Sequence, residues 1–341
     1  MDKKTNLQSL FIAIAPNHIS NFENIIRVNK NVNSPVLLNP GNFNYNDKIW
    51  KEVINGDLDL KYRESNSFKK IIYQIKKILG YKFFLKKFYK HISLHCKYDF
   101  YYCNLDDILS NHIFNFLQNK KLTSNNYAVE DGILNYYYPI IENSKLTSKR
   151  IFCKNILGIN FTPIDIHPTA IHSKDVKAQY VRLPENSICP EKSINLPFKQ
   201  IEYKPIENVV LIIGQDIMHN SPEGPDYYKE RVKVLFGLIL KDLDLGAKVV
   251  YKPHRNGDYT IAEGILKSTF KNFEMFQDVT PIEECISKIK PKKIYSFESS
   301  AMLNLKIAFN EVDIYIAVLP YNNTESKLVS IFKNIGIEIL Q

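Results

Sequence analysis

Short apolar segments alternate with longer helix-like segments along most of the 341-residue chain, and this alternation constrains the fold more than any other feature. The apolar runs end at turn-forming residues: residues 10–15 end at Pro16, and residues 208–213 end at Gly214. Such short runs are typical of strands that are buried on both faces. Strands that alternate with helices form mainly parallel sheets covered by helices on each side. The sequence therefore predicts an α/β fold.

The length of the chain suits two domains, because a single hydrophobic core rarely extends beyond about 250–300 residues. Six prolines, at positions 163, 168, 184, 190, 197 and 205, interrupt the candidate helices from about residue 147 onward. We interpret this proline-rich stretch as the crossing between an N-terminal domain, residues 1–190, and a C-terminal domain, residues 191–341. In open α/β sheets ligands bind beyond the carboxyl ends of the strands, so we expect the functional residues at these ends.

The composition predicts a globular protein without a membrane span. Hydrophobic residues make up 45% of the chain and charged residues 24%, which is typical of folded domains. The longest apolar runs are far shorter than the roughly 20 residues that cross a bilayer, and residues 10–15 make a poor signal peptide. Five scattered cysteines without CxxC spacing predict free thiols in a reducing cytoplasm rather than disulfides or a zinc cluster.

Residues 65–96 form a basic segment that contains eight lysines and no acidic residue. The first interpretation is an amphipathic helix with a solvated lysine face. The second is peripheral binding to an anionic membrane, where each lysine contributes about 1 kcal/mol; this would hold a cytoplasmic enzyme on the inner face of the cytoplasmic membrane. Binding of nucleic acid is the third, but no nucleic-acid module accompanies the charge, so we expect no nucleic-acid partner.

The first candidate site is Glu130-Asp131-Gly132, which follows a predicted strand at residues 127–130. A glycine after two carboxylates suits a sharp turn that points an acid into a cleft. Such an acid accepts a proton from a hydroxyl if it is ionised near neutral pH. The alternative is an ordinary Asp-Gly turn with no chemical role.

The second candidate site follows the predicted strand at residues 248–252 and consists of Lys252, Pro253, His254 and Arg255. Cationic side chains at the end of a strand are suited to a phosphate, because they make charge-assisted hydrogen bonds. His254 is able to protonate a phosphate leaving group or to bind it as imidazolium. A purely structural histidine is the alternative.

Three further segments complete the candidate nucleotide-binding site. Ser299 and Ser300 stand where a strand feeds directly into a helix, so that hydroxyls and free N–H groups face an anion; plain N-capping is the alternative. Gly214 and Gln215 end another strand, where glycine permits close approach of a ligand. Glu283 lies at a possible helix start near a ribose or base.

Other catalytic signatures are missing from the sequence. It contains no GxGxxG, Walker, HExxH or GxSxG motif, which argues against dinucleotide-dependent dehydrogenases and P-loop enzymes. Two DxD sequences, at residues 57–59 and 242–244, fall in segments predicted to be helical, and we interpret them as solvated faces rather than metal ligands.

The order of these motifs carries a resemblance to a known family. An acid-acid-glycine motif at 130–132, Lys-Pro-His at 252–254, Pro-Ile-Glu at 281–283 and Ser-Ser at 299–300 occur in sequence. The chain resembles the bacterial GT-B sialyltransferases, which include the lipooligosaccharide sialyltransferases and the capsular polysialyltransferases. The similarity spans roughly residues 8 to 320. It implies a GT-B fold of two Rossmann-like domains facing a central cleft.

The resemblance also implies a reaction and assigns roles to the candidate residues. Asp131 would be the general base for an acceptor hydroxyl, with Glu130 as its substitute, and His254 would assist the departure of CMP from CMP-sialic acid. Ser299 and Ser300 would hold the CMP phosphate. The transfer would be inverting and independent of metals and cofactors, and the acceptor would be lipooligosaccharide or a capsule glycan.

One position departs from the family pattern and keeps the donor open. Residue 255 is Arg, where the family usually has proline. A CMP-Kdo or CDP-linked donor is therefore the alternative within the same fold. A non-catalytic basic protein that binds membranes or polyanions through residues 65–96 is the alternative from another class.

Overall fold

The computed structural model describes residues 6–58, 67–139, 141, 143–164, 166–216, 218, 223–254, 257–278, 280–309, 313–321 and 327–341. The chain divides into two compact units, Met1–Pro197 and Phe198–Gln341. Each unit is an α/β domain with its own parallel sheet, in agreement with the predicted fold class. Arg255 lies outside the described residues.

The first unit contains a seven-stranded parallel sheet in the order β3-β2-β1-β4-β5-β6-β7. Its strands are β1 (Leu7–Ile12), β2 (Val36–Asn39), β3 (Glu52–Asn55), β4 (Lys97–Tyr102), β5 (Thr123–Val129), β6 (Ala178–Val181) and β7 (Ser193–Asn195). This is the order of doubly wound, Rossmann-like sheets. The order reverses between β1 and β4, and ligands bind beside such a switch point.

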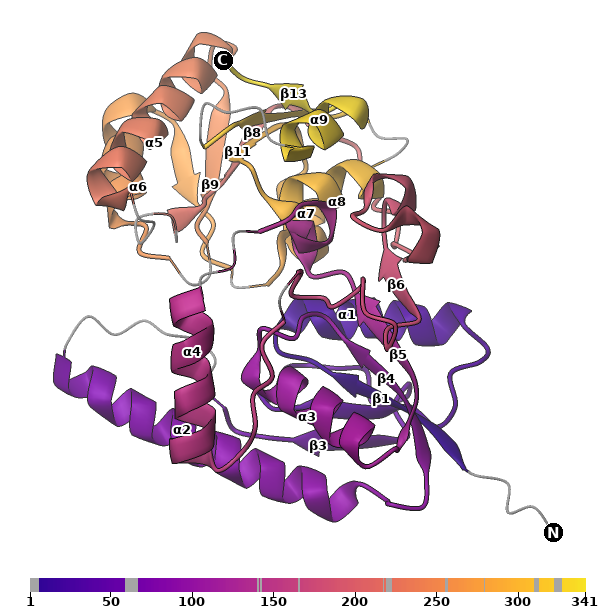
Figure 1. The fold of residues 1–341 in the computed structure, drawn as a ribbon. Helices are drawn as coiled ribbons and strands as arrows, with labels where there is room; N and C mark the ends of the chain where they lie inside the picture. Colours follow the sequence, from indigo (N-terminus) through magenta and orange to yellow (C-terminus); the bar gives the residue numbers. More distant parts are fainter. Residues whose placement is uncertain are drawn as a thin grey trace. The chain divides into compact units, whose positions relative to one another are not determined.

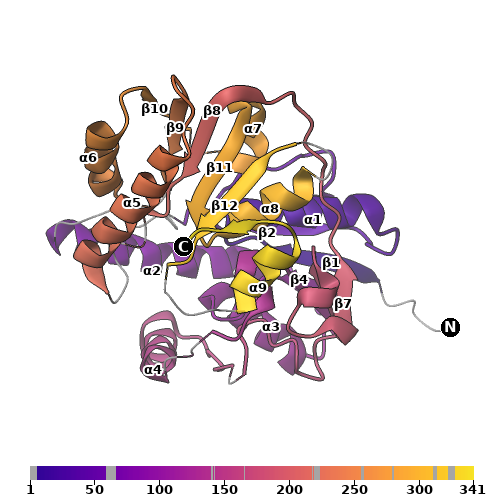
Figure 2. The same cartoon turned by 90° about the horizontal axis from the view of Figure 1, so that it is seen from above.

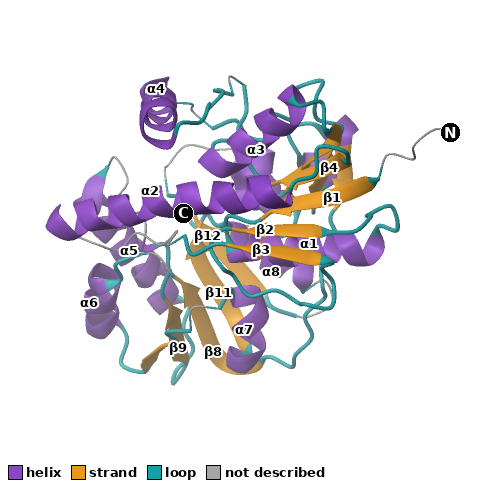
Figure 3. Ribbon diagram, turned by 90° about the horizontal axis from the view of Figure 1, so that it is seen from below, coloured by secondary structure: helices purple, strands orange, loops and turns teal. Residues whose placement is uncertain are grey.

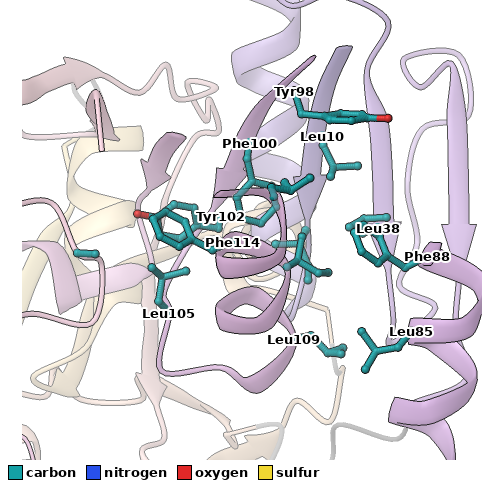
Figure 4. Packing of buried hydrophobic residues seen from close by; sticks show 14 of the residues in the cluster. Leu10, Leu38, Leu85, Phe88, Tyr98, Phe100, Tyr102, Leu105, Leu109 and Phe114 are labelled. Atoms are coloured by element: carbon teal, nitrogen blue, oxygen red, sulfur yellow. The ribbon is translucent and has the colours of Figure 1, made fainter. Parts of the chain in front are cut away.

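Helices cover both faces of the first sheet (Figures 1 and 3). The helices of this unit are α1 (Pro16–Val28), α2 (Ser67–His91), α3 (Ile108–Asn119) and α4 (Asn143–Phe152), and its helical turns are η1 (Gly132–Tyr136), η2 (Cys153–Leu157), η3 (Pro184–Asn186) and η4 (Pro190–Lys192). Helix α1 covers one face of the sheet, and α2 and α3 cover the other. Alternate residues of β1 serve opposite faces. Phe11 packs on Phe22 of α1, with ring centroids 5.3 Å apart, whereas Leu10 joins a core with α2 and α3. Figure 4 shows Leu85 and Phe88 of α2 near Leu38 in this second core.

The second unit contains a six-stranded parallel sheet in the order β10-β9-β8-β11-β12-β13. Its strands are β8 (Ile206–Ile213), β9 (Lys248–Lys252), β10 (Phe273–Met275), β11 (Pro291–Phe297), β12 (Tyr315–Leu319) and β13 (Glu338–Ile339). Its helices are α5 (Gly224–Lys241), α6 (Thr260–Thr269), α7 (Ile282–Ile289), α8 (Ser300–Ala308) and α9 (Lys327–Asn334). Counted within each unit, the first six strands follow the same order. Figure 2 shows α5 and α6 on one side of this sheet and α7 and α8 on the other.

Local sequence signals determine where several helices begin. Pro16 opens α1, where its missing N–H is not needed by the helix. Asp107 caps α3 by accepting the N–H of Ser110 at 2.8 Å, and Ser299 caps α8 by accepting the N–H of Ala301 at 3.2 Å. Each cap satisfies one backbone donor that a helix start leaves unpaired.

Most of the stretch from residue 147 to 205, which the sequence assigns to the crossing between the domains, belongs to the first unit. This stretch holds part of α4 and the strands β6 and β7, which extend the first sheet. Pro184 and Pro190 open the turns η3 and η4 rather than interrupt longer helices. Because β7 pairs with β6 up to Asn195, the chain leaves the first unit later than the boundary predicted at residue 190.

The cysteines are free, and most of them are buried. Cys96 is partly exposed, and the other four thiols are inside the protein. Burial raises the pKa of Cys153, Cys189 and Cys285 to about 11, and it raises the pKa of Cys103 well above its ordinary value. None of the helices that the structure describes is both long and apolar enough to cross a membrane.

Candidate active site

Three polar side chains lie where β1, β4 and β5 end, around the switch point of the first sheet. His18 belongs to the first turn of α1, directly after β1, while Asn104 follows β4 and Asp131 follows β5. Neighbouring parallel strands end at the same edge of the sheet, so residues far apart in the chain meet there. Both His18 and Asn104 contact the carboxylate of Asp131.

The backbone around Asp131 forms the turn that the acid-acid-glycine motif predicts. The N–H of Asp131 donates to Oδ1 of Asn135 at 2.9 Å. Gly132 has a φ of 58°, a left-handed conformation that glycine adopts without steric cost. The side chain of Asp131 is 27% exposed, so its carboxylate is accessible to a substrate.

His18 contacts Asp131 through a defined tautomer. Nδ1 of the buried ring lies 3.2 Å from the backbone N–H of Ile14 and must accept it, because an N–H only donates. The ring hydrogen is therefore on Nε2, which donates to Oδ1 of Asp131 at 3.1 Å. Asn104 donates from Nδ2 to the other oxygen, Oδ2. Two donors on two oxygens fix the orientation of the carboxylate.

Glu130, the preceding residue, has the opposite environment. Its side chain is fully buried and forms an ion pair with Arg182. It also accepts hydrogen bonds from the hydroxyl of Tyr136 and, at 2.7 Å, from the backbone N–H of Arg182. Burial and then the charge of Glu130 raise the pKa of Tyr136 well above its usual value, so the hydroxyl stays protonated and donates. These contacts give Glu130 a structural role and do not support it as a substitute base.

A pocket of about 290 Å³ lies beside the Asp131 cluster, within the first unit. Asn104, which binds Asp131, contributes to its wall, as does Leu134 of η1. The rest of the wall is largely apolar but includes Lys145 and Lys149 of α4. Lys149 forms an ion pair with the neighbouring Asp106.

In the second unit, a buried aspartate positions the backbone of His254. Asp216, which follows β8, is fully buried and accepts the hydroxyl of Tyr228 at 3.0 Å and that of Tyr251 at 2.6 Å. Its Oδ2 accepts the backbone N–H of His254 at 2.7 Å. Burial and the charge of Asp216 raise the pKa of both tyrosines, so both remain donors. The ends of β8 and β9 are thereby joined by one carboxylate.

The same network explains Gly214 differently from the prediction. A Cβ at position 214 would lie 2.4 Å from the hydroxyl oxygen of Tyr251 and 2.5 Å from Oδ2 of Asp216. Close approach of the protein's own side chains is therefore sufficient to require glycine at this position, and the approach of a ligand there stays a prediction. Gln215 follows it, and its carbonyl accepts the N–H of Met218 at 2.9 Å.

Lys252 is turned towards the protein interior. The residue is buried, its ammonium donates to the carbonyl of Asp278, and the same ammonium lies 5.7 Å from the ring centroid of Phe276. The sequence predicts that this ammonium binds a phosphate, whereas in the structure it contacts Asp278 and Phe276. Pro253 connects Lys252 to His254, and both Pro253 and His254 are partly exposed.

The serine pair lies at the start of α8, as predicted. Ser299 is the buried N-cap, and Ser300 is the first, partly exposed residue of the helix. Glu283 of α7 contacts this helix: its Oε1 accepts a hydrogen bond from Nδ2 of Asn304 at 2.7 Å. The free N–H groups of a helix start attract an anion, and β11, which leads into it, is the neighbour of β8.

Each sheet thus gathers its own set of predicted residues. Asp131 follows β5 of the first sheet, next to β4 and its switch point, while Gly214, His254 and Ser299 follow strands β8, β9 and β11 of the second. Sequence reasoning missed His18, although it follows the Pro16-Asn17 signal. It also missed Asn104, Arg182 and the role of Asp216, because their contacts span distant parts of the chain.

A family model described as alpha-2,8-polysialyltransferase (POLYST) matches residues 3–318. The chain belongs to this family. As a member of the polysialyltransferase family it is a glycosyltransferase of the sialyltransferase type, which excludes the alternative of a non-catalytic basic protein. No sequence among the curated proteins matches the chain.

Solved structures of bacterial sialyltransferases have a fold similar to that of this polysialyltransferase-family protein. An α/β-galactoside α-2,3-sialyltransferase from Photobacterium phosphoreum is similar with a TM-score of 0.52 at 13% identity, covering 99% of each chain. A 2,6-sialyltransferase from Photobacterium sp. JT-ISH-224, solved with CMP and lactose, has a TM-score of 0.51 at 11% identity and covers 97% of this chain and 78% of its own. These neighbours confirm the predicted GT-B fold.

Proposed function

We propose that the protein transfers sialic acid from CMP-sialic acid to a hydroxyl of a bacterial surface glycan, with inversion and without a metal. The acceptor oxygen forms a bond to the anomeric carbon as the bond from that carbon to the phosphate oxygen breaks. The hydroxyl proton passes to Asp131, and CMP leaves with the electron pair and its negative charge. The glycan belongs to lipooligosaccharide or to a capsule.

The observation that carries this proposal is the carboxylate of Asp131, held between two donors and still accessible. His18 and Asn104 fix its orientation, which suits a base that must meet one hydroxyl in one geometry. An ionised carboxylate is an acceptor only, so it is a group that can take the proton of an incoming hydroxyl. Its neighbour Glu130 has no such access.

The second unit offers a site for the leaving group. His254 is held at the end of β9 by the bond from its N–H to Asp216, and the start of α8 presents Ser299 and Ser300. A helix N-terminus with serine hydroxyls stabilises a phosphate that gains charge. We assign these groups to the CMP phosphate. The CMP in the Photobacterium sp. JT-ISH-224 complex supports the choice of nucleotide.

We assign the pocket beside Asn104 to the acceptor. It adjoins the proposed base through one hydrogen bond, and its wall combines apolar side chains with Lys145 and Lys149. The apolar part suits the C–H faces of a sugar, and the lysines suit a carboxylate. The α-2,8 linkage in the family description supports an acceptor that itself ends in sialic acid.

The proposal is tested by CMP release from CMP-sialic acid in the presence of a sialylated oligosaccharide. Asp131→Asn keeps the shape of the side chain and is expected to lower turnover by about 10²–10⁴-fold. Asp175→Asn changes an exposed aspartate of the same unit and is the matched control. Equal turnover for Asp131→Asn and the unchanged protein would refute the role of the base.

The donor and the stereochemistry need their own measurements. CMP-Kdo and CDP-linked donors are assayed in parallel, and nucleotide release from one of these alone would replace CMP-sialic acid as the donor. Nuclear magnetic resonance of the product gives the anomeric configuration, and retention would overturn the inverting displacement. Activity that is lost with a chelator and restored by a divalent cation would overturn the metal-independent mechanism.

A further inference from the structure

Helix α2 packs on the first sheet through one face only. Tyr81, Phe84, Leu85 and Phe88 are buried in the core that α2 shares with α3. Their spacing of i, i+3, i+4 and i+7 is that of a single helix face. Figure 4 shows Leu85 and Phe88 directed at this core. This face accounts for the attachment of α2 to the fold.

A second apolar stripe runs along the opposite face of α2. Ile72 is 40% exposed, Ile75 is 52%, Leu79 is 48% and Phe83 is 63%. The spacing of i, i+3, i+7 and i+11 aligns them on one side of a helix with 3.6 residues per turn. The core of the first unit does not explain these four side chains, because they point away from it.

Lysines are interleaved with this outer stripe. Lys76, Lys82, Lys86 and Lys90 are all exposed, and they fall within the same half of the helix circumference as the stripe. Within the described parts of the chain, no acidic side chain forms an ion pair with any of the four. At the C-terminal end of α2, Nε2 of His91 lies 3.7 Å from Oε1 of Glu52.

The combination distinguishes among the interpretations left open by the sequence. A merely solvated helix has polar residues on its outer face, and a site for a soluble polyanion needs lysines but no aliphatic stripe. Exposed large apolar side chains flanked by lysines are the pattern of a helix that lies in the plane of a membrane interface. There the apolar groups enter the acyl boundary and the ammonium groups meet anionic headgroups.

We propose that the outer face of α2 docks on an anionic lipid bilayer and holds the enzyme there as a peripheral membrane protein. The inner leaflet of the cytoplasmic membrane is a surface of this kind. The occupant of the stripe is therefore lipid rather than another protein. The inference rests on the faces of α2 alone and does not depend on the assignment of Asp131 or His254.

The test is co-sedimentation of the 341-residue protein with vesicles of phosphatidylcholine, alone or mixed in equal parts with phosphatidylglycerol. Lys76→Glu with Lys86→Glu is expected to weaken binding to the anionic vesicles by at least about 25-fold, since each lysine contributes about fivefold. Phe83→Ser is expected to weaken it by about tenfold or more. Lys229→Glu with Lys241→Glu on α5 makes the same change in net charge on exposed lysines and is expected to leave binding unchanged.

The outcomes separate lipid from other partners. The proposal holds if affinity needs phosphatidylglycerol, falls with salt and depends on both the lysines and Phe83. Equal losses in the two charge-reversal pairs would overturn it, because net charge alone would then explain binding. Unchanged binding of Phe83→Ser, with tight binding to soluble dextran sulfate, would also overturn it in favour of a polyanion. A further readout is Phe83→Trp, whose fluorescence must shift to shorter wavelength on anionic vesicles.

Discussion

Replacement of Arg182 by methionine tests whether the charge of Glu130 is compensated by this one guanidinium. Glu130 is fully buried, and the side chain of Arg182 is 5% exposed. Loss of the guanidinium leaves the carboxylate with the hydroxyl of Tyr136 and one backbone N–H. It also removes the donor to Oδ1 of Asn21, now at 2.7 Å.

Breaking a buried pair by removing one partner destabilises a protein by about 3–5 kcal/mol. For a unit of this size, 1 kcal/mol corresponds to about 2–4 °C in melting temperature. The first unit should therefore melt about 6–20 °C lower in Arg182→Met. The double variant that adds Glu130→Gln should recover much of the loss, because no uncompensated charge remains in the interior.

Trp50 makes the assay specific for the first unit. It is the single tryptophan of the chain, and its buried indole donates to Oε1 of Glu23 at 3.3 Å. Its fluorescence during urea or thermal unfolding reports on this unit alone. If the free energy of unfolding of Arg182→Met lay within about 1 kcal/mol of that of the unchanged protein, Arg182 would not be the group that compensates Glu130. Additive effects of the two substitutions in the double variant would exclude the pairing as well.

Three more predictions follow from single contacts or exposures. Gly214→Ala should destabilise the second unit by about 1–3 kcal/mol, because its Cβ would overlap a tyrosine hydroxyl. The control Gly237→Ala, in an open stretch of α5, should instead stabilise the unit by about 0.5–1 kcal/mol. Urea unfolding measures both changes in the free energy of unfolding. A maleimide at neutral pH should label Cys96 alone, since the other thiols are buried and have raised pKa values; peptide mass spectrometry locates the label. His18→Gln should lower kcat by up to about 100-fold with little change in KM. A rise in KM as large as the fall in kcat would contradict the role of His18 in orienting Asp131.

The sequence contained enough information for the layer structure and the main strands. The structure confirms the strands predicted at residues 10–15, 208–213 and 248–252, which are β1, β8 and β9 with at most small shifts in their ends. They were predictable because continuous β-branched and aromatic runs are typical of buried parallel strands. The shorter strands β3, β10 and β13 were not predicted. They have only a few residues each, so tertiary pairing rather than local pattern defines them.

The candidate site was predicted less completely than the fold. Asp131, Gly132 and Ser299 occupy the turn and the helix cap that their local motifs indicate, because these features depend on neighbouring residues. The contacts of Lys252 and Glu283 were not predictable, since their partners are set by packing between segments. His18 was missed for the same reason: its partner Asp131 is 113 residues away.

The adjacent residues Glu130 and Asp131 have different exposures, and this has a consequence for genetics. In a library that randomises both codons, substitutions at position 130 should deplete folded protein, because no other side chain combines a carboxylate with the required reach to Arg182. Substitutions at position 131 should leave cellular abundance largely intact while abolishing product. The codon for residue 130 would then report on folding, which is measured as the level of protein. The codon for residue 131 would report on catalysis, which is measured by staining the glycan at the cell surface.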